Sequence, residues 1–258
     1  MRIEKEFMRR IAAAAAAETL PRFRMAGLAS DNKYAVGFDP VTEADRAAEQ
    51  AIRSLIHDAF PDHGIVGEEF GVENGDSRHV WVIDPIDGTR SFISGIPLWG
   101  TLVGLLEDGD AVAGMMFQPF TGEAFHADAD GAHYEGPGGA RALGVRPTTA
   151  LGEATLCTTT PALFAGGKRA AYDRLEREVK LARYGTDCYA YAMLAAGTID
   201  LVVESGLQLY DIVALVPIIE KAGGVITTWD GGPAEKAGDI VAAATPELHR
   251  AALELLNG

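Results

Sequence analysis

The segment from Trp81 to Gly95, WVIDPIDGTRSFISG, constrains the fold more than any other part of the chain. Its first residues are apolar or β-forming, as in a buried strand, yet they lead directly into Asp84 and then Asp87. Carboxylates this close repel each other, and one of them stays protonated unless a cation lies between them. Since hard cations such as Mg²⁺ prefer oxygen ligands, the segment predicts a strand that ends in a divalent-metal site. The simpler alternative is that Asp87 only caps a helix.

The two residues after this pair, Gly88 and Thr89, are expected to open a short helix. The first amides of a helix have no partner inside it, and with the positive end of the helix dipole they favour an anion. An acidic pair that binds a metal, followed directly by a helix start that binds an anion, describes a phosphate ester held against Mg²⁺.

Three further acids lie near the expected ends of other elements. Glu68 follows a β-like stretch, while Asp45 and Asp211 lie close to the starts of helices. Taken singly, Glu68 fits an exposed acidic loop, and the two aspartates fit helix caps. Acids at four separate strand ends or helix starts are more than chance capping explains. The pattern therefore favours one acidic site.

The remaining elements follow from periodicity and from turn residues. Helices are predicted over 3–20 and 39–60, the second capped by Thr42 with Asp45 three residues later. Residues 65–66 and 79–84 are expected to be strands, and residues 71–78 a flexible loop. Asp-Gly and Thr-Gly pairs divide 99–136 into an antiparallel meander.

The second half of the chain alternates between helices and strands. Helices are expected over 167–178, 186–197, 210–224 and 245–258, with strands over 199–206 and 224–232. Pro217 should kink the third of these helices. Helices flanking two β-rich groups indicate a mixed α/β (α+β) sandwich, which we interpret as a single domain, 1–258, with two lobes and a soft boundary near residue 145.

Composition excludes several classes of protein. The net charge is −15, from 37 acidic and 22 basic residues, which argues against a nucleic-acid or anionic-membrane binder. The two cysteines, Cys157 and Cys188, lack metal-type spacing and suit a reducing compartment. The alanine-rich stretch near the start is bounded by charged residues, so it predicts a helix rather than a signal peptide. A cytoplasmic protein is expected.

The motifs resemble the inositol-monophosphatase-like superfamily of Mg²⁺-dependent, lithium-sensitive phosphomonoesterases. The matching strings are VTEAD at 41–45, GEE at 67–69, DPIDGT at 84–89, and Asp211 ahead of EKAGG at 220–224. The resemblance covers nearly the whole chain. It implies a layered α-β-α-β-α sandwich of the inositol monophosphatase and fructose-1,6-bisphosphatase type, usually as a homodimer, acting on a small phosphate monoester.

The resemblance also implies roles for individual residues. Two or three Mg²⁺ ions would be held by Glu68, Asp84, the backbone carbonyl of Ile86, Asp87 and Asp211. The catalytic residues would be Glu68 and Thr89, which activate a water, with Asp45 supporting Thr89. Residues implied to bind the substrate are Asp87, Gly88, Thr89, Arg183, Asp187, Glu204 and Asp211.

Within the superfamily, residues 84–105 and 184–224 are most similar to histidinol-phosphate phosphatases of histidine biosynthesis. Inositol phosphatases commonly have Thr-Asn where this chain has Arg90-Ser91, and Trp where it has Tyr210. An arginine in the first turn opposes the helix dipole, so Arg90 is expected to have an acidic or phosphate partner unless it is simply solvated.

Histidinol phosphate carries an ammonium group, which two carboxylates, Asp187 and Glu204, complement better than they do a neutral polyol. Asp187 is alternatively a helix cap, and Arg183 can serve either the phosphate or a neighbouring subunit. Histidinol-phosphate hydrolysis is the leading hypothesis. The alternatives are an inositol-1-monophosphatase, a broad sugar or nucleotide phosphatase, and a non-catalytic metal- or phosphate-binding regulator. The complete set of implied metal and water-activating residues argues against the regulator.

Overall fold

The eight strands of the larger sheet run along the N-terminal half of the chain. In this computed structural model, which describes residues 5–28, 30–32 and 40–258, their spatial order is β10-β9-β8-β7-β6-β5-β3-β4. Their bounds are β3 Gly64–Gly67, β4 Gly71–Glu73, β5 His79–Asp87, β6 Gly100–Glu107, β7 Asp110–Gln118, β8 Glu123–Asp128, β9 Gly131–Gly136 and β10 Gly139–Ala142. From β5 to β10 each neighbour is antiparallel, which confirms the predicted meander.

The prediction of a flexible loop over 71–78 is wrong for its first residues. Gly71–Glu73 forms β4, which pairs antiparallel with β3 at the edge of the sheet. All three of its residues are exposed, so the strand shows no alternation of buried and exposed positions. Backbone hydrogen bonds alone define it, and composition does not reveal those.

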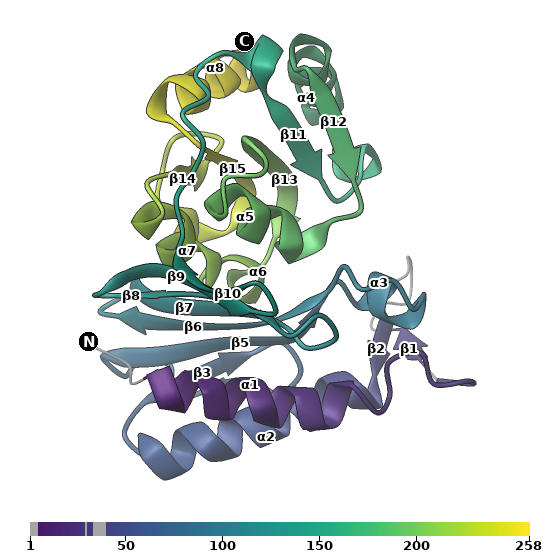
Figure 1. Ribbon diagram of the computed structural model, residues 1–258, viewed down its shortest axis with the longest axis vertical. Helices are drawn as coiled ribbons and strands as arrows, with labels where there is room; N and C mark the ends of the chain where they lie inside the picture. Colours follow the sequence, from purple (N-terminus) through teal and green to yellow (C-terminus); the bar gives the residue numbers. More distant parts are fainter. Residues whose placement is uncertain (1–4, 29, 33–39) are drawn as a thin grey trace.

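Two helices cover the outer face of the larger sheet (Figure 1). They are α1 (Lys5–Thr19) and α2 (Glu43–Ala59), and they pack through Ile11 and Ile52 onto Trp81 of β5. Both predicted helices are present, but the second begins at Glu43, because residues 40–42 of its predicted range form a strand; residues 3, 4 and 39 lie outside the described part. Thr42 is the N-cap of α2 and forms the expected capping box with Asp45. A small ladder of β1 (Ser30–Asn32) and β2 (Pro40–Thr42) precedes α2.

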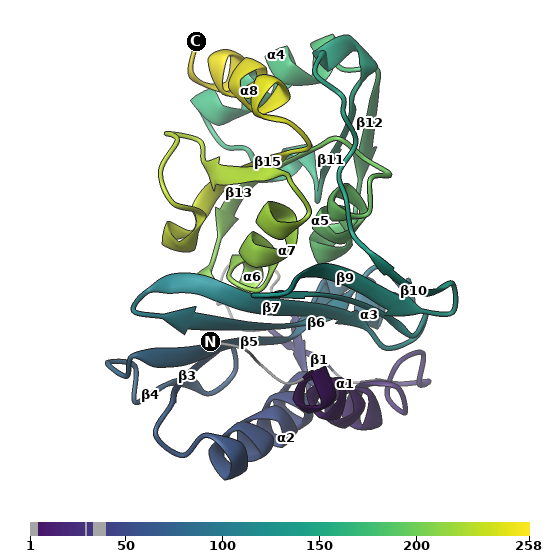
Figure 2. The same ribbon diagram turned by 60° about the vertical axis from the view of Figure 1, so that its left-hand side comes forward.

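The smaller sheet has five strands in the order β12-β11-β13-β15-β14. Their bounds are β11 Thr155–Thr158, β12 Leu181–Tyr184, β13 Leu201–Leu207, β14 Val225–Thr228 and β15 Gly238–Ala243. Helices α4 (Gly167–Glu178) and α8 (Pro246–Asn257) cover its outer face, and Thr245 is the N-cap of α8 (Figure 2). Short 3₁₀ turns lie at Leu151–Glu153, Pro161–Leu163 and Ala234–Lys236.

Three helices fill the space between the sheets: α5 (Asp187–Ala195), α6 (Leu209–Ile212) and α7 (Leu215–Lys221) (Figure 1). The single kinked helix predicted over 210–224 is therefore two helices. The break falls at Val213 and Ala214 instead of Pro217, because a proline has no N–H to donate to the carbonyl four residues earlier. Pro217 itself lies in the first turn of α7, where that loss is tolerated.

The stacking of helices and sheets confirms the predicted α-β-α-β-α sandwich (Figure 1). One buried apolar cluster joins both sheets, with members such as Leu102 and Phe125 from the larger one and Val202 and Ile240 from the smaller. The chain crosses between the sheets after Ala142 and before Thr155. We propose on these grounds that the chain is one domain with two lobes. None of the helices in the described residues is long and apolar enough to cross a bilayer.

Candidate active site

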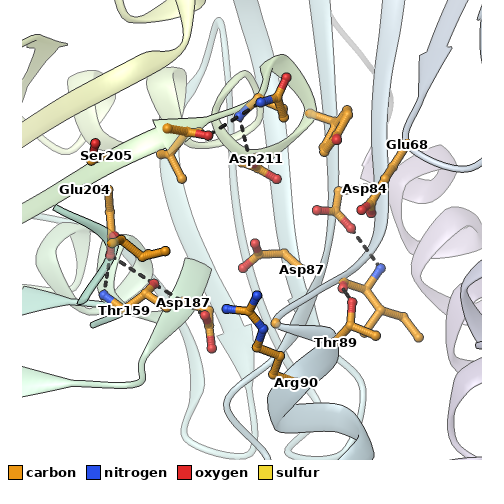
Figure 3. Close-up of a pocket in the computed structure, with 17 residues that line it drawn as sticks. Glu68, Asp84, Asp87, Thr89, Arg90, Thr159, Asp187, Glu204, Ser205 and Asp211 are labelled. Carbon is orange, nitrogen blue, oxygen red and sulfur yellow. Dashed lines mark hydrogen bonds between the residues drawn. The ribbon is translucent and has the colours of Figure 1, made fainter. Parts of the chain in front are cut away.

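A cavity of about 430 Å³ lies where the two sheets meet. Figure 3 shows its lining side chains pointing inward from both lobes. They come from the β3–β4 turn, the end of β5 with the short helix α3 (Thr89–Ile93), the segment after β11, the start of α5, and the end of β13 with α6. The lining residues are Glu68, Asp84, Ile86, Asp87, Gly88, Thr89, Arg90, Thr159, Leu163, Asp187, Glu204, Ser205, Gly206, Leu207, Gln208, Tyr210 and Asp211.

A bulge in β5 brings its two aspartates to the same side. Residues three apart in a regular strand point to opposite faces of the sheet. Here the pairing with β6 shifts by one residue, since Asp84 lies opposite Leu102 while Asp87 lies opposite Gly100. Such a bulge re-aims side chains, and Asp84 and Asp87 both reach the cavity. The amide of Ile86 donates to Asp84 Oδ1 at 3.0 Å within this bulge.

Asp211 completes a group of three carboxylates. Oxygens of Asp84, Asp87 and Asp211 all lie within 4.8 Å of one another. Asp211 is the third residue of α6, and its Oδ2 accepts the Gln208 amide at 2.7 Å. The alternative of Asp211 as the cap itself is wrong, because Gln208 is the N-cap, but its carboxylate does accept the amide of that cap while it lines the cavity. Asp87 does not cap α3, because Gly88 occupies that position with φ 86° and Asp87 Oδ2 accepts the Cys188 amide at 2.6 Å.

The electrostatics of this group fit a hard cation. Burial raises the pKa of Asp84 well above its ordinary value, and the negative charges of Glu68, Asp87 and Asp211 raise it further. Burial likewise raises the pKa of Asp87, with added effects of Asp187 and Asp211. A divalent ion removes this repulsion, and the donor set consists of oxygens alone, as Mg²⁺ prefers.

The predicted water-activating residues lie beside the three carboxylates. The Glu68 amide donates to Ile83 O at 3.1 Å, and its side chain lines the cavity next to Asp84 (Figure 3). Thr89 Oγ1 lies 3.1 Å from Ile86 O and 3.5 Å from Asp45 Oδ1. Asp45 does not line the cavity but is buried behind Thr89, where burial raises its pKa to about 6. It completes the capping box of α2 with Thr42 and also contacts Thr89.

Asp187 and Glu204 lie together on the opposite wall of the cavity (Figure 3). Thr159 joins them, because its hydroxyl lies 3.3 Å from Asp187 Oδ1 and 3.0 Å from Glu204 Oε1. The Thr159 amide also donates to Glu204 Oε1 at 2.6 Å. Glu204 is 2% exposed, and this burial raises its pKa to about 8.

The backbone at Asp187 is unusual. Its φ is 42°, a region that few residues other than glycine adopt. Asp187 is the first residue of α5 and Thr186 is the cap, so the alternative of Asp187 as a helix cap is wrong. Its Oδ2 instead accepts the Ser91 hydroxyl at 3.2 Å. Burial raises the pKa of Asp187, and the positive charge of Arg90 opposes that rise. Arg90 is expected from the sequence to have an acidic or phosphate partner, and Asp187 is an acidic residue close enough to interact with it.

The structure differs from the predicted site in two respects. Arg183 is exposed on the edge strand β12 and does not line the cavity of this chain. Thr159 and Ser205 line it but were not predicted. The signal for Thr159 was the run of threonines at 158–160 before Pro161, since polar residues that end a strand often face a site.

Comparison with known proteins places the chain among phosphatases. The bifunctional phosphatase IMPL2 of Arabidopsis thaliana is 42% identical over 235 residues, which cover 84% of this chain and 65% of that protein. A histidinol-phosphatase of Streptomyces coelicolor is 35% identical and covers 96% of this chain and 94% of its own length. The inositol-1-monophosphatase ImpA of Mycolicibacterium smegmatis is 36% identical and covers 86% and 81%.

A solved structure agrees with these relatives. An inositol monophosphatase from Zymomonas mobilis matches over 100% of both chains with 39% identity and a TM-score of 0.87. The model of the inositol monophosphatase family matches residues 4–258. The relatives of this chain include both histidinol-phosphatases and inositol-1-monophosphatases, so membership of the family does not identify the alcohol half of the substrate. The chain belongs to the inositol monophosphatase family of phosphatases.

Proposed function

We propose that this protein is an Mg²⁺-dependent phosphomonoesterase that hydrolyses L-histidinol phosphate to L-histidinol and phosphate. One observation carries the choice of substrate. Two carboxylates, the half-buried Asp187 and the buried Glu204, are joined through Thr159 on the wall that faces the three metal-type aspartates (Figure 3). The cavity thus has one end suited to a phosphate with its metal and another suited to a cation.

The metal end draws on residues of both lobes. Asp84, Asp87 and Asp211, with Glu68 and the carbonyl of Ile86, would hold two or three Mg²⁺ ions. When bound, Mg²⁺ supplies positive charge that stabilises the phosphoryl group and makes a nearby water more acidic. The role of the protein is to keep these oxygens converged in a buried place, where their mutual repulsion favours the cation.

The chain's own groups direct the reaction. The Glu68 carboxylate and the Thr89 hydroxyl orient the attacking water. Its proton goes to Glu68 directly, or to Thr89 as Thr89 passes its own proton to Asp45. The amides of Gly88 and Thr89 donate to phosphoryl oxygens as negative charge shifts in the transition state. Water attacks phosphorus directly as the bond from phosphorus to the ester oxygen breaks, and the leaving oxygen takes up a proton to give the alcohol, so no side chain becomes phosphorylated.

The charge of the opposite wall matches a substrate with one ammonium group. Asp187 and Glu204 are formally two negative charges, and Arg90 beside Asp187 offsets one of them. Glu204 holds a proton more tightly than an ordinary glutamate because it is buried. A cation next to it restores the ionised carboxylate and forms a charge-assisted hydrogen bond. A neutral polyol has no positive charge with which to favour the ionised carboxylate.

Inositol-1-phosphate hydrolysis is the second candidate, with a broad sugar or nucleotide phosphatase close behind. ImpA and the Zymomonas mobilis structure are as similar to this chain as the histidinol-phosphatases are. A non-catalytic regulator is disfavoured because Glu68 and Thr89 accompany all the metal-type carboxylates in the cavity. A homodimer, lithium sensitivity, a cytoplasmic location and the absence of nucleic-acid partners stay predictions.

Kinetics on purified protein test the proposal. We expect kcat/KM with Mg²⁺ to be higher for histidinol phosphate than for inositol 1-phosphate. Asp187→Asn should raise KM for histidinol phosphate about 10- to 100-fold, which corresponds to losing one hydrogen bond to a charged group. The same variant should leave KM for a neutral phosphate ester unchanged, which serves as its control. Equal or faster turnover of inositol 1-phosphate by the wild type would contradict the substrate assignment.

A further inference from the structure

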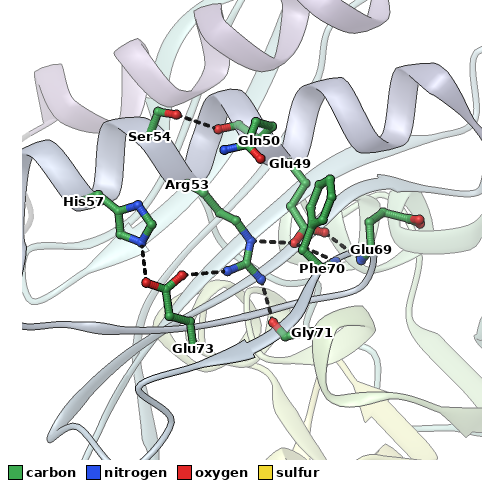
Figure 4. A network of polar contacts seen from close by, with 9 residues as sticks. All are labelled: Glu49, Gln50, Arg53, Ser54, His57, Glu69, Phe70, Gly71 and Glu73. Atoms are coloured by element: carbon green, nitrogen blue, oxygen red, sulfur yellow. Dashed lines mark hydrogen bonds and ion pairs between the residues drawn. The ribbon is translucent and has the colours of Figure 1, made fainter.

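Behind the turn that carries Glu68 lies a buried ion pair that the proposed chemistry does not use. Glu49 and Arg53 are one helical turn apart on α2, and Arg53 Nε lies 2.8 Å from Glu49 Oε1. The Glu49 side chain is 0% exposed and that of Arg53 is 6% exposed. Figure 4 shows both pointing from α2 toward the β3–β4 turn.

Glu49 binds the backbone of this turn directly. Its Oε2 accepts the Glu69 amide at 2.7 Å, and its Oε1 accepts the Phe70 amide at 3.3 Å (Figure 4). These amides follow Glu68 immediately in the chain. The Glu68 amide is itself held by Ile83 O on β5. The backbone on both sides of the Glu68 side chain is therefore anchored, by α2 on one side and by the sheet on the other.

Arg53 ties down the far end of the same turn. Its Nη2 donates to Gly71 O at 2.5 Å, and its Nη1 lies 3.5 Å from Glu73 of β4. Glu73 also lies 3.1 Å from His57 Nε2. One guanidinium thus connects α2, the Glu49 carboxylate and the start of β4 in a fixed fork, which a lysine has no means to do.

Gly67 makes the close approach possible. A Cβ on Gly67 would lie 1.9 Å from Glu49 Oε1, so any side chain at this position displaces the carboxylate. The glycine of the GEE string therefore has a packing reason. A buried ion pair contributes little net stability, because desolvation of the two charges offsets their attraction. Its position directly against the Glu68 turn points to another role.

We propose that Glu49 and Arg53 are positioning residues that fix Glu68 in the geometry that Mg²⁺ binding requires. The inference rests on the proposed function, in which Glu68 is a metal ligand and water-activating group. Outer groups that orient ligands typically change metal affinity or activity about 10- to 100-fold when they are removed. The ion pair acts through Glu68 and touches neither metal nor substrate.

Glu49→Gln tests this without changing the size of the side chain. Both carboxylate oxygens of Glu49 face N–H donors, whereas an amide has one oxygen and one donor group. One donor of the turn or of Arg53 is then opposed by another donor. We expect the Mg²⁺ dissociation constant, measured by calorimetry without substrate, to rise about 10- to 100-fold. Hydrogen exchange at amides 69 and 70 should become faster.

Asp200→Asn is the matched control. Asp200 is also 0% exposed, pairs with Arg146 at 3.3 Å and accepts the Thr155 amide at 2.8 Å, but it does not line the cavity. It should lower the melting temperature without altering the Mg²⁺ dissociation constant or exchange at amides 69 and 70. Arg53→Lys should give an intermediate loss of Mg²⁺ affinity. If Glu49→Gln fails to fold, Arg53→Lys is compared with Asp200→Asn in its place.

Two results would overturn the inference: unchanged exchange at amides 69 and 70 in Glu49→Gln, or a loss of Mg²⁺ affinity no larger than that of Asp200→Asn. A failure of the proposed function looks different. In that case the wild-type protein itself would show no Mg²⁺ binding and no phosphatase activity. Faster exchange in Glu49→Gln would then still support the anchoring of the turn, and only the link to the metal would be lost.

Discussion

Individual residues in this cavity are held in states that favour function over stability. Asp187 has a φ of 42°, and three carboxylates converge within 4.8 Å. Glu204 is buried among threonines and has a pKa raised to about 8. Strained or like-charged groups persist only where the surrounding structure enforces them, and they cluster at functional sites.

Glu204 gives a prediction about pH. Its pKa in the folded protein is raised to about 8, so the folded state binds a proton that the unfolded state releases near its ordinary value. This contribution to stability is complete below the ordinary pKa and is lost as pH rises through about 8. Glu204→Gln keeps a neutral group at every pH. It fits, because its oxygen can accept the Thr159 amide while its nitrogen donates to Thr158.

Urea unfolding of the metal-free proteins at pH 5 and at pH 9 measures this effect. We expect the free energy of unfolding of Glu204→Gln, relative to that of the wild type, to increase as pH rises. The largest slope this one group allows is about 1.4 kcal/mol per pH unit between the two pKa values. A difference that is the same at both pH values would show that Glu204 is ionised in the folded protein throughout.

At the scale of elements, the first turn of α2 contains both the cap of the helix and a residue that supports the candidate site. Thr42 Oγ1 accepts the Ala44 amide at 3.1 Å as a cap, and it donates to Asp45 Oδ2 at 2.6 Å. The other oxygen of Asp45 lies 3.5 Å from Thr89 in the cavity wall. Further along the same helix, Glu49 and Arg53 hold the turn of Glu68. One face of α2 thus supports two groups of the candidate site.

Comparison of Thr42→Ala with Thr245→Ala separates the effect of losing a helix cap from the effect of losing support for the site. Loss of an N-cap costs about 1 kcal/mol, so the melting temperature should fall. Because Asp45 also loses an anchor, kcat should fall as well. Thr245→Ala removes the cap of α8. The Thr245 hydroxyl accepts the Leu248 amide at 3.2 Å, and Thr245 does not line the cavity. It should lower the melting temperature by a similar amount with kcat unchanged. A normal kcat in Thr42→Ala would show that Asp45 does not need the Thr42 hydroxyl, since its Oδ2 also accepts the Thr42 amide at 2.8 Å.

At the scale of the whole molecule, the site exists only because the two sheets are packed together. Asp84 and Asp87 come from β5 of the larger sheet, while Glu204 comes from β13 of the smaller one and Asp211 from the helices between. The contact between lobes is close at the break between α6 and α7. A Cβ on Gly114 of β7 would lie 2.0 Å from Ala214 O, so this strand and that turn touch backbone to backbone.

Gly114→Ala should therefore destabilise the whole molecule. Overpacking costs about 1–3 kcal/mol or more, and with one shared core the cost should appear in a single transition. Differential scanning calorimetry should show one peak shifted to lower temperature. Gly144→Ala is the control, because a Cβ there meets nothing within 4 Å, and its peak should not move. Two separate peaks, only one of them shifted, would contradict the proposal of a single domain.

Local features of the sequence determined much of this protein. The Asp84–Thr89 string, the Thr42–Asp45 box and the Asp-Gly turns depend on neighbours within a few residues, and all of them appear where they were predicted. The resemblance carried by these motifs supplied the acids of the cavity and the layered fold. Such features can be predicted from the sequence because their hydrogen bonds and turn geometry involve only residues that are close together in the chain.

Only the tertiary structure decided how those residues meet. The pairing of β5 with β6 introduces the bulge that turns Asp84 and Asp87 to one side. Thr159 joins Asp187 to Glu204 across 28 and 45 residues of chain, and Arg183 of a neighbouring strand stays outside the cavity. Register shifts and contacts between distant segments depend on how sheets and helices pack in three dimensions, and no spacing along the sequence encodes that packing directly.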